Sequence, residues 1–224
     1  MAGAAVPAGA ADLQIVVDRR GETIELYIAT RADRFVSTFA LPAEELTDAA
    51  GTVDFDALRL GTWDIGDVMF DRVVTTLDAT PVDFEAMSLM VHPIADALLM
   101  STPLEGIIAI GVCSVETPAT QPTLDALQGY AGYIAYVDDS DGVLALQLPA
   151  TGRGALDVSI ADFEDQRLID RYTLTVADGE GIVIPGTQPA QAVLAAIANP
   201  MMFVLGGLAL GSAMVVRARK SPTG

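Results

Sequence analysis

The residues best suited to chemistry in this sequence are soft metal ligands near its middle. Met87, Met90, His92 and Met100 lie close together along the chain. Thioether and imidazole groups are ligands that Cu(I) prefers in proteins. Alternate side chains of a strand face opposite sides, so Met90 and His92 should share a face while Met87 points the other way. Met90 and His92 are therefore candidate copper ligands, although the residue types favour ordinary packing in a hydrophobic core.

Other patterns of catalytic or metal-binding residues are weak. The chain has one histidine and one cysteine, Cys113, so no disulfide can form within it. The acidic run at residues 138–142 lacks the spacing of a calcium loop. There is no Walker A loop, no G-x-G-x-x-G and no G-x-S-x-G elbow. We expect a non-catalytic protein, and an enzyme built on carboxylates is a further alternative.

A long uncharged stretch near the C-terminus is expected to anchor the preceding domain. Residues 181–216 carry no charge. Because a helix needs about 20 apolar residues to cross a bilayer, we predict one transmembrane helix over residues 191–216, kinked at Pro200. The alternative is a shorter helix that starts at Pro200 and is capped by Asn199. Three basic residues follow at once: Arg217, Arg219 and Lys220.

Two features of this segment predict its surroundings. Gly207 and Gly211 form a G-x-x-x-G step, which lets helix backbones approach closely. We therefore expect this face to pack against helices of other membrane protein subunits. Lys and Arg gather on the cytoplasmic side of a membrane, which places the basic tail 217–224 in the cytoplasm and the preceding domain outside, in the periplasm. The alternative is a tail-anchored protein with a cytoplasmic domain.

The composition indicates which partners to expect. Thirty acidic residues stand against twelve basic ones, giving a formal net charge of −18. A field of this sign repels nucleic acid and anionic lipid, so no nucleic-acid partner is expected. Residues 1–11 are rich in alanine and glycine and are interpreted as a disordered segment or the remnant of a signal peptide.

Residues 12–177 have the alternation and turn signals of a β domain. Tight hairpins are expected around residues 18–21, 138–142 and 164–166. Short helices are expected within 42–60 and 118–128, a loop at 62–66, and the centre of a sheet in the apolar run 105–115. The predicted strands are 13–17, 22–29, 34–41, 68–77, 85–92, 105–115, 130–137, 143–148, 155–163 and 168–177.

The regular spacing of these strands predicts a mainly β fold, an immunoglobulin-like β-sandwich, with α+β as the alternative. Residues 178–190, rich in glycine and proline, are assigned to a linker before the membrane helix. The sequence thus predicts a membrane-anchored, extracytoplasmic accessory or assembly subunit of a membrane complex. A periplasmic copper(I) metallochaperone is the second hypothesis.

Overall fold

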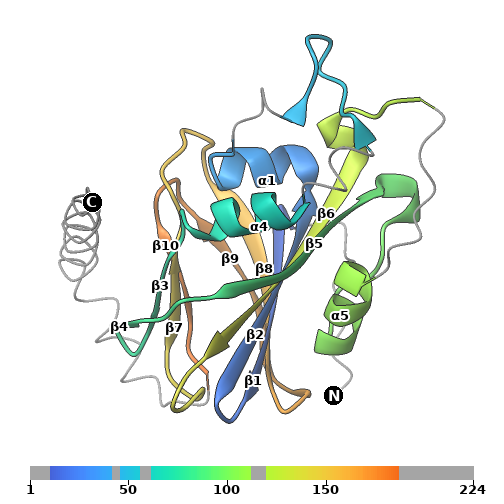
Figure 1. Cartoon of the computed structure of the whole chain (residues 1–224). Helices are drawn as coiled ribbons and strands as arrows, with labels where there is room; N and C mark the ends of the chain where they lie inside the picture. The colour runs from blue at the N-terminus through green and yellow to red at the C-terminus, as the bar shows by residue number, and fades with distance from the viewer. Residues whose placement is uncertain (1–10, 42–45, 56–61, 112–119, 187–224) are drawn as a thin grey trace, which may run out of the picture.

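A computed structural model of the chain describes residues 11–41, 46–55, 62–111 and 120–186 (Figure 1). These residues form a mainly β fold with two sheets, as the sequence predicts. The larger sheet has the order β5 (Glu85–Pro93), β6 (Leu127–Tyr136), β2 (Thr23–Arg31), β1 (Leu13–Arg20), β8 (Leu156–Glu164), β9 (Arg167–Val176). The smaller sheet has the order β10 (Gly181–Ile184), β7 (Leu144–Gln147), β3 (Val74–Leu77), β4 (Thr80–Pro81).

Helices cover both faces of the larger sheet. Within the described residues, the α-helices are α1 (Ala32–Thr38), α4 (Thr62–Phe70) and α5 (Pro103–Gly111), and short 3-10 helices occupy Ile94–Asp96 and Leu124–Ala126. Figure 1 shows α1 and α4 together on one side and α5 on its own at the right. Two of the three hairpins expected from the sequence are present, because β1 pairs with β2 and β8 with β9 in antiparallel register. Strands β1 and β8 pair in parallel, so the sheet is mixed.

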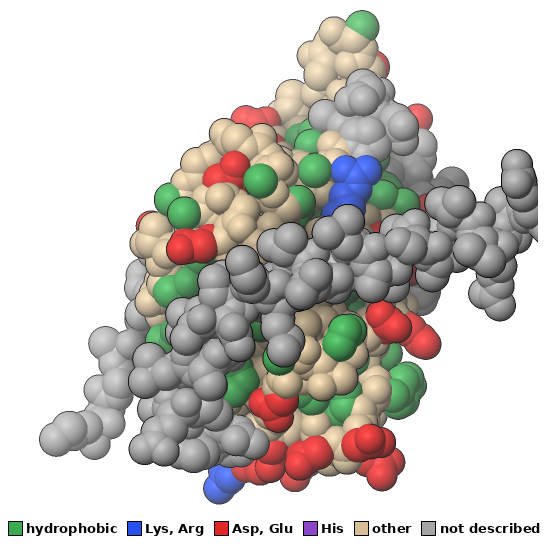
Figure 2. Space-filling model, turned by 90° about the vertical axis from the view of Figure 1, so that its left-hand side faces the viewer, with side chains coloured by type: hydrophobic (Ala, Val, Ile, Leu, Met, Phe, Trp, Pro, Cys, Tyr) green, Lys and Arg blue, Asp and Glu red, His purple; other side chains and the backbone are tan. Residues whose placement is uncertain are grey.

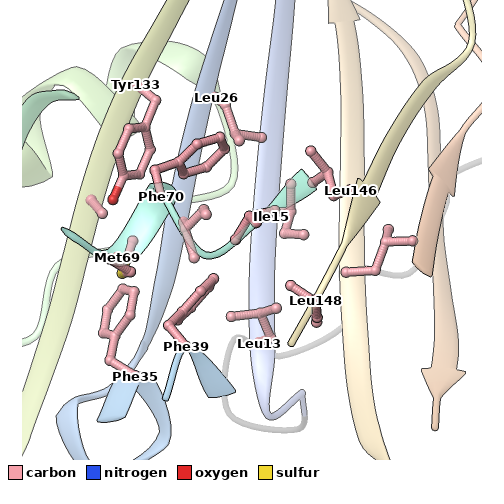
Figure 3. Close-up of a cluster of buried hydrophobic side chains, with 14 of the residues drawn as sticks. Leu13, Ile15, Leu26, Phe35, Phe39, Met69, Phe70, Tyr133, Leu146 and Leu148 are labelled. Carbon is pink, nitrogen blue, oxygen red and sulfur yellow. The ribbon is translucent and has the colours of Figure 1, made fainter. Parts of the chain in front are cut away.

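The main core lies between the larger sheet, the smaller sheet and helices α1 and α4 (Figure 3). Alternation along the strands builds it, because every second residue of β1 and β2 points inward. The residues of β2 that were expected to face a dry side, Ile24, Leu26 and Ile28, are at most 2% exposed. Leu146 of β7 approaches from the opposite sheet. Burying each such aliphatic side chain contributes roughly 1.5–3 kcal/mol.

A second apolar cluster lies on the outer face of the larger sheet, beneath α5. Gly106 of α5 rests on the ring of Tyr27, and Ile110 rests on Gly132. The chain before the helix is fixed at the other side of the sheet, because the Arg171 guanidinium donates to the carbonyl oxygen of Ser101. Helix α5 and the segment before it therefore cross the strands of the sheet.

Three predicted strands are wrong in whole or in part. Residues 34–41 contribute most of α1. Phe35 of α1 and Phe39, the residue that caps its C-terminus, lie one turn apart and pack with ring centroids at 5.7 Å. Within the run 105–115, the described residues belong to α5. The range 68–77 is split between the end of α4 and β3, and the loop expected at 62–66 is the start of α4.

The turn at residues 138–142 does not close a hairpin. Strand β6 pairs with β2 and β5, whereas β7 pairs with β3 and β10, so the chain passes here from one sheet to the other. The domain also extends further than expected. Residues 181–184, assigned to the linker, form β10, and Ile182 and Ile184 are fully buried.

The predicted membrane segment lies outside the described residues. This applies to the helix 191–216 with its small-residue face Gly207 and Gly211, to the basic residues Arg217, Arg219 and Lys220, and to Cys113. Among the residues that the structure does describe, no helix has the length and apolar character needed to cross a membrane.

Candidate functional site

The candidate metal ligands Met90 and His92 lie on β5 beneath α5. Both side chains are buried, at 8% and 2% exposure. Leu89 and Val91, which alternate with them, belong to the inner core, so Met90 and His92 share the outer face, as the strand period requires. The His92 and Tyr130 rings pack in a T-shaped arrangement, with centroids 5.3 Å apart and an interplanar angle of 79°.

A backbone carbonyl of α5 contacts the His92 ring. Its Nε2 lies 3.3 Å from the carbonyl oxygen of Ala109 in α5. A carbonyl oxygen can only accept, so Nε2 carries the proton and donates it. A metal ion at Nε2 would therefore have to displace α5 from the ring. The neighbouring Tyr130 hydroxyl is used by the backbone, since it donates to the Leu98 oxygen at 2.8 Å and accepts from the Leu98 N–H at 2.7 Å.

A β-bulge changes the position of Met87. The pairing of β5 with β6 shifts between Ala86 and Ser88, which leaves Met87 as the extra residue. Met87 then packs against the outer cluster, together with Met100, instead of pointing to the opposite side. The thioethers of Met87 and Met100 thus lie in the same cluster as Tyr130, the ring that contacts His92. No group of three or more His, Cys, Asp or Glu side chains suited to a metal occurs among the described residues.

Among the described residues, Arg19 near the end of β1 is a buried polar group that donates to four acceptors. Its Nε donates to Asp162 of β8 at 2.9 Å, and both side chains are almost completely buried. Its Nη1 donates to the carbonyl oxygens of Ser140 and Gly142 at 2.6 and 2.8 Å, and its Nη2 to that of Ile184 at 3.3 Å. One guanidinium therefore ties together the larger sheet, the turn after β6 and the end of β10.

The acidic turn 138–142 is organised by this arginine. Two of its backbone carbonyls accept from Arg19, and the Asp139 carboxylate accepts from the Asp141 N–H at 3.1 Å. The carbonyl groups that a calcium ion would need are thus already bonded to a cation. Burial raises the pKa of the partner Asp162, and Arg19 and the Gly186 N–H oppose that rise. The cluster around Arg19 therefore has a structural role, because it joins these segments of the chain.

Two surface hollows contain carboxylates. One, of about 460 Å³, is lined by Leu46, Thr47, Asp48, Thr52, Asp54 and Gln121. The other, of about 420 Å³, is lined by Asp67, Phe70, Asp71, Phe84, Glu85 and Ala86. All the carboxylates in both are exposed. Hydrogen bonds from Thr52 lower the pKa of Asp48, the opposite of what a general acid needs. Burial therefore does not set one carboxylate apart from another in either hollow.

Glycines mark where helices touch the sheet, and this signal is separate from the alternation that predicts the strands. A Cβ at Gly129 would collide with Phe35 of α1, and one at Gly132 would collide with Ile110 of α5. The two glycines lie three apart on β6 and so face opposite sides of the sheet. A glycine-rich strand of this kind indicates close packing on both faces.

Comparison with known proteins adds no functional assignment. No protein-family model matches the chain, and no curated protein matches it either.

Proposed function

We propose that this protein is a membrane-anchored accessory or assembly subunit that presents its β domain outside the cytoplasmic membrane and does no catalysis itself. The observation that carries the proposal is the uncharged stretch from residue 181 to 216, followed directly by three basic residues. The Gly207 and Gly211 step supplies a surface for the helix of another subunit. The cytoplasm then holds only the tail 217–224.

The way the domain ends supports this assignment. Gly186, the last described residue, donates its N–H to the buried Asp162, and β10 just before it is held by Arg19. Between Gly186 and the expected start of the span at residue 191 the chain can reach roughly 17 Å. The folded domain is thus held beside the bilayer, where an accessory subunit would contact the exposed parts of its partners.

The finer description of the fold remains a prediction. Two sheets that share one core support the immunoglobulin-like sandwich. The parallel pairing of β1 with β8, together with α1 and α4 on the inner face, favours the α+β alternative.

Membrane topology is the first test. A reporter fused after Gly224 should be active only in the cytoplasm, and protease added to intact spheroplasts should digest the domain. A protected domain would contradict the extracytoplasmic location and support the tail-anchored alternative.

The second test addresses assembly. Gly207→Leu should reduce co-purification of other membrane proteins in mild detergent, because the larger side chain keeps helix backbones apart. Ala209→Leu is the matched control, since residues two apart face different sides of a helix. Equal co-purification by both variants would remove the helix-docking part of the proposal.

The β-bulge at Met87 is the one observation that favours the copper(I) alternative, because it brings a further thioether to the side of Met90 and His92. A chaperone of this kind would bind Cu(I) stoichiometrically and lose it on His92→Ala. Met69→Leu is the control, since Met69 belongs to the inner core. Binding no stronger than in the His92→Ala variant would end this alternative.

A further inference from the structure

The outer side of α5 exposes apolar side chains to solvent. Leu104, Ile107 and Ile108 are 62%, 39% and 47% exposed. Their spacing of i, i+3 and i+4 places them on one face of the helix, opposite the face that packs on Tyr27. Two more exposed side chains, Ile94 and Leu99, lie in the segment just before the helix. Exposed apolar side chains that are concentrated in this way are typical of an interaction surface.

The fold keeps this face turned outward. Glu105 caps the helix start, because its Oε2 accepts from the Ser101 N–H at 2.7 Å and from the Ser101 hydroxyl at 2.6 Å. On the inner side, Gly106 lies directly against the Tyr27 ring, which leaves no room for the helix to rotate. The exposed face is therefore a fixed part of the native surface.

The charge around this face restricts what can cover it. No Lys or Arg occurs between Arg72 and Arg153, the part of the chain that includes β5, α5 and β6, whereas ten Asp and Glu residues do. Arg171 of β9 reaches the segment before α5, where its guanidinium donates to the carbonyl oxygen of Ser101. Asp96, between Ile94 and Leu99, is exposed. An anionic lipid surface or a second copy of this acidic domain would bring like charges together. A protein surface with apolar side chains and a basic rim would bring opposite charges together.

We propose that the exposed face of α5, formed by Leu104, Ile107 and Ile108, docks together with the exposed segment before it, which carries Ile94 and Leu99, onto an apolar, Lys/Arg-rimmed surface of a neighbouring subunit. This inference rests on the proposed function, because it takes the domain to work within a membrane complex. It adds a second contact to the helix contact at Gly207 and Gly211, and it specifies the chemistry of the partner.

The test places a photo-cross-linking amino acid in the full chain in its native membranes, at Leu104 or at Ile108. The matched control is Leu168, which is 47% exposed on β9. We expect an adduct with one other protein from both α5 positions, several-fold above that from Leu168. The cross-linked peptide should be apolar and flanked by Lys or Arg. All positions are exposed, and equal thermal stability of the variants confirms that the fold is kept.

A charge reversal makes the prediction specific. With the probe at Leu104, Asp96→Lys should lower the adduct yield several-fold, whereas Asp170→Lys, at an exposed position of β9, should leave it unchanged. Glu105 is avoided because its carboxylate caps α5. Adducts only with a second copy of the chain, adducts only with lipid, yields equal to that at Leu168, no adduct, or no effect of Asp96→Lys would each overturn the inference.

Failure of this inference and failure of the proposed function give different results. If the chain lies in membranes and Gly207→Leu disrupts its association while the α5 probes give no adduct, only the α5 contact is wrong. If the chain fractionates away from membranes, the membrane-anchored function is wrong, and the probes at Leu104 and Ile108 still report on α5 directly.

Discussion

At the scale of single residues, the Arg19–Asp162 pair shows how a buried charge can connect distant segments. Arg19 is fully buried and gives hydrogen bonds to four acceptors. Such a pair adds little net stability compared with apolar side chains of the same size, but removing one partner leaves the other charge buried without compensation. The pair therefore acts mainly to specify where the turn after β6 and the end of β10 attach.

Asp162→Asn should lower the free energy of unfolding by about 3–5 kcal/mol, because Arg19 then keeps its charge without a counterion. Adding Arg19→Met to Asp162→Asn should recover part of the loss. Urea denaturation of the single and double variants measures this coupling. As a control, Arg167→Ala removes an exposed ion pair with Glu164 and should change stability by no more than about 0.5 kcal/mol. Additive effects of the two core substitutions would contradict the coupling.

Gly106 provides a second prediction at this scale. A Cβ at this position would lie 2.6 Å from Cγ of Tyr27, so Gly106→Ala must push α5 away from the sheet. We expect a loss of about 1–3 kcal/mol, typical of overpacking. Gly111→Ala on the same helix is the matched control, because a Cβ there has nothing within 4 Å. Thermal unfolding measures the stability of both variants. Equal stability of Gly106→Ala and Gly111→Ala would mean that α5 does not rest on Tyr27.

At the scale of elements, hairpins could be predicted from the sequence, whereas helix α5 could not. Hairpins such as β1–β2 are predictable because alternation and a glycine turn occur together. The apolar run that becomes α5 has no period, since both its buried and its exposed faces are apolar, and strand and helix then look alike. The signal for this helix is local, because Thr102 followed by Pro103 and then Glu105 is typical of a helix start. In the structure, Thr102 Oγ1 accepts a hydrogen bond from the Glu105 N–H at 3.3 Å.

The candidate metal site was predictable to a similar extent. Strand alternation was enough to place Met90 and His92 on one face. The position of Met87 was not predictable, because a bulge depends on how β5 and β6 pair and not on the residues of β5 alone. The contact of His92 with Ala109 was also hidden, since it requires a helix where the sequence predicted a strand.

The cap of α5 gives a prediction for pH dependence. The Ser101 hydroxyl bond, together with backbone N–H bonds, lowers the pKa of Glu105 below its ordinary value of 4.5. A carboxyl group whose pKa is lowered by folding stabilises the folded state above its unfolded pKa, and that contribution is lost as the pH falls through the folded pKa. The unfolding free energy of the wild type should therefore exceed that of Glu105→Gln by about 1 kcal/mol near pH 6. The difference should shrink as the pH falls below the ordinary pKa of the carboxyl group. A constant difference in unfolding free energy across this range would contradict the cap.

At the scale of the whole molecule, charge balance is the dominant feature. Acidic residues outnumber basic ones by thirty to twelve. Figure 2 shows acidic side chains gathered at the lower end of one face of the molecule. The basic residues there are few, and most described arginines already form ion pairs. The remaining carboxylates therefore repel one another, and this repulsion opposes the compact state.

This balance determines how stability should respond to salt. Screening weakens both the surface ion pairs and the repulsion between carboxylates, and the Debye length falls from about 30 Å at 0.01 M to about 8 Å at 0.15 M. Exposed pairs such as Arg31–Asp33 contribute little, whereas Arg19–Asp162 is buried and therefore largely insensitive to salt. Repulsion is thus the larger salt-sensitive contribution, and the melting temperature should rise with sodium chloride over this range. A fall would mean that surface ion pairs outweigh repulsion, and it would also weaken the charge argument for a basic partner at α5.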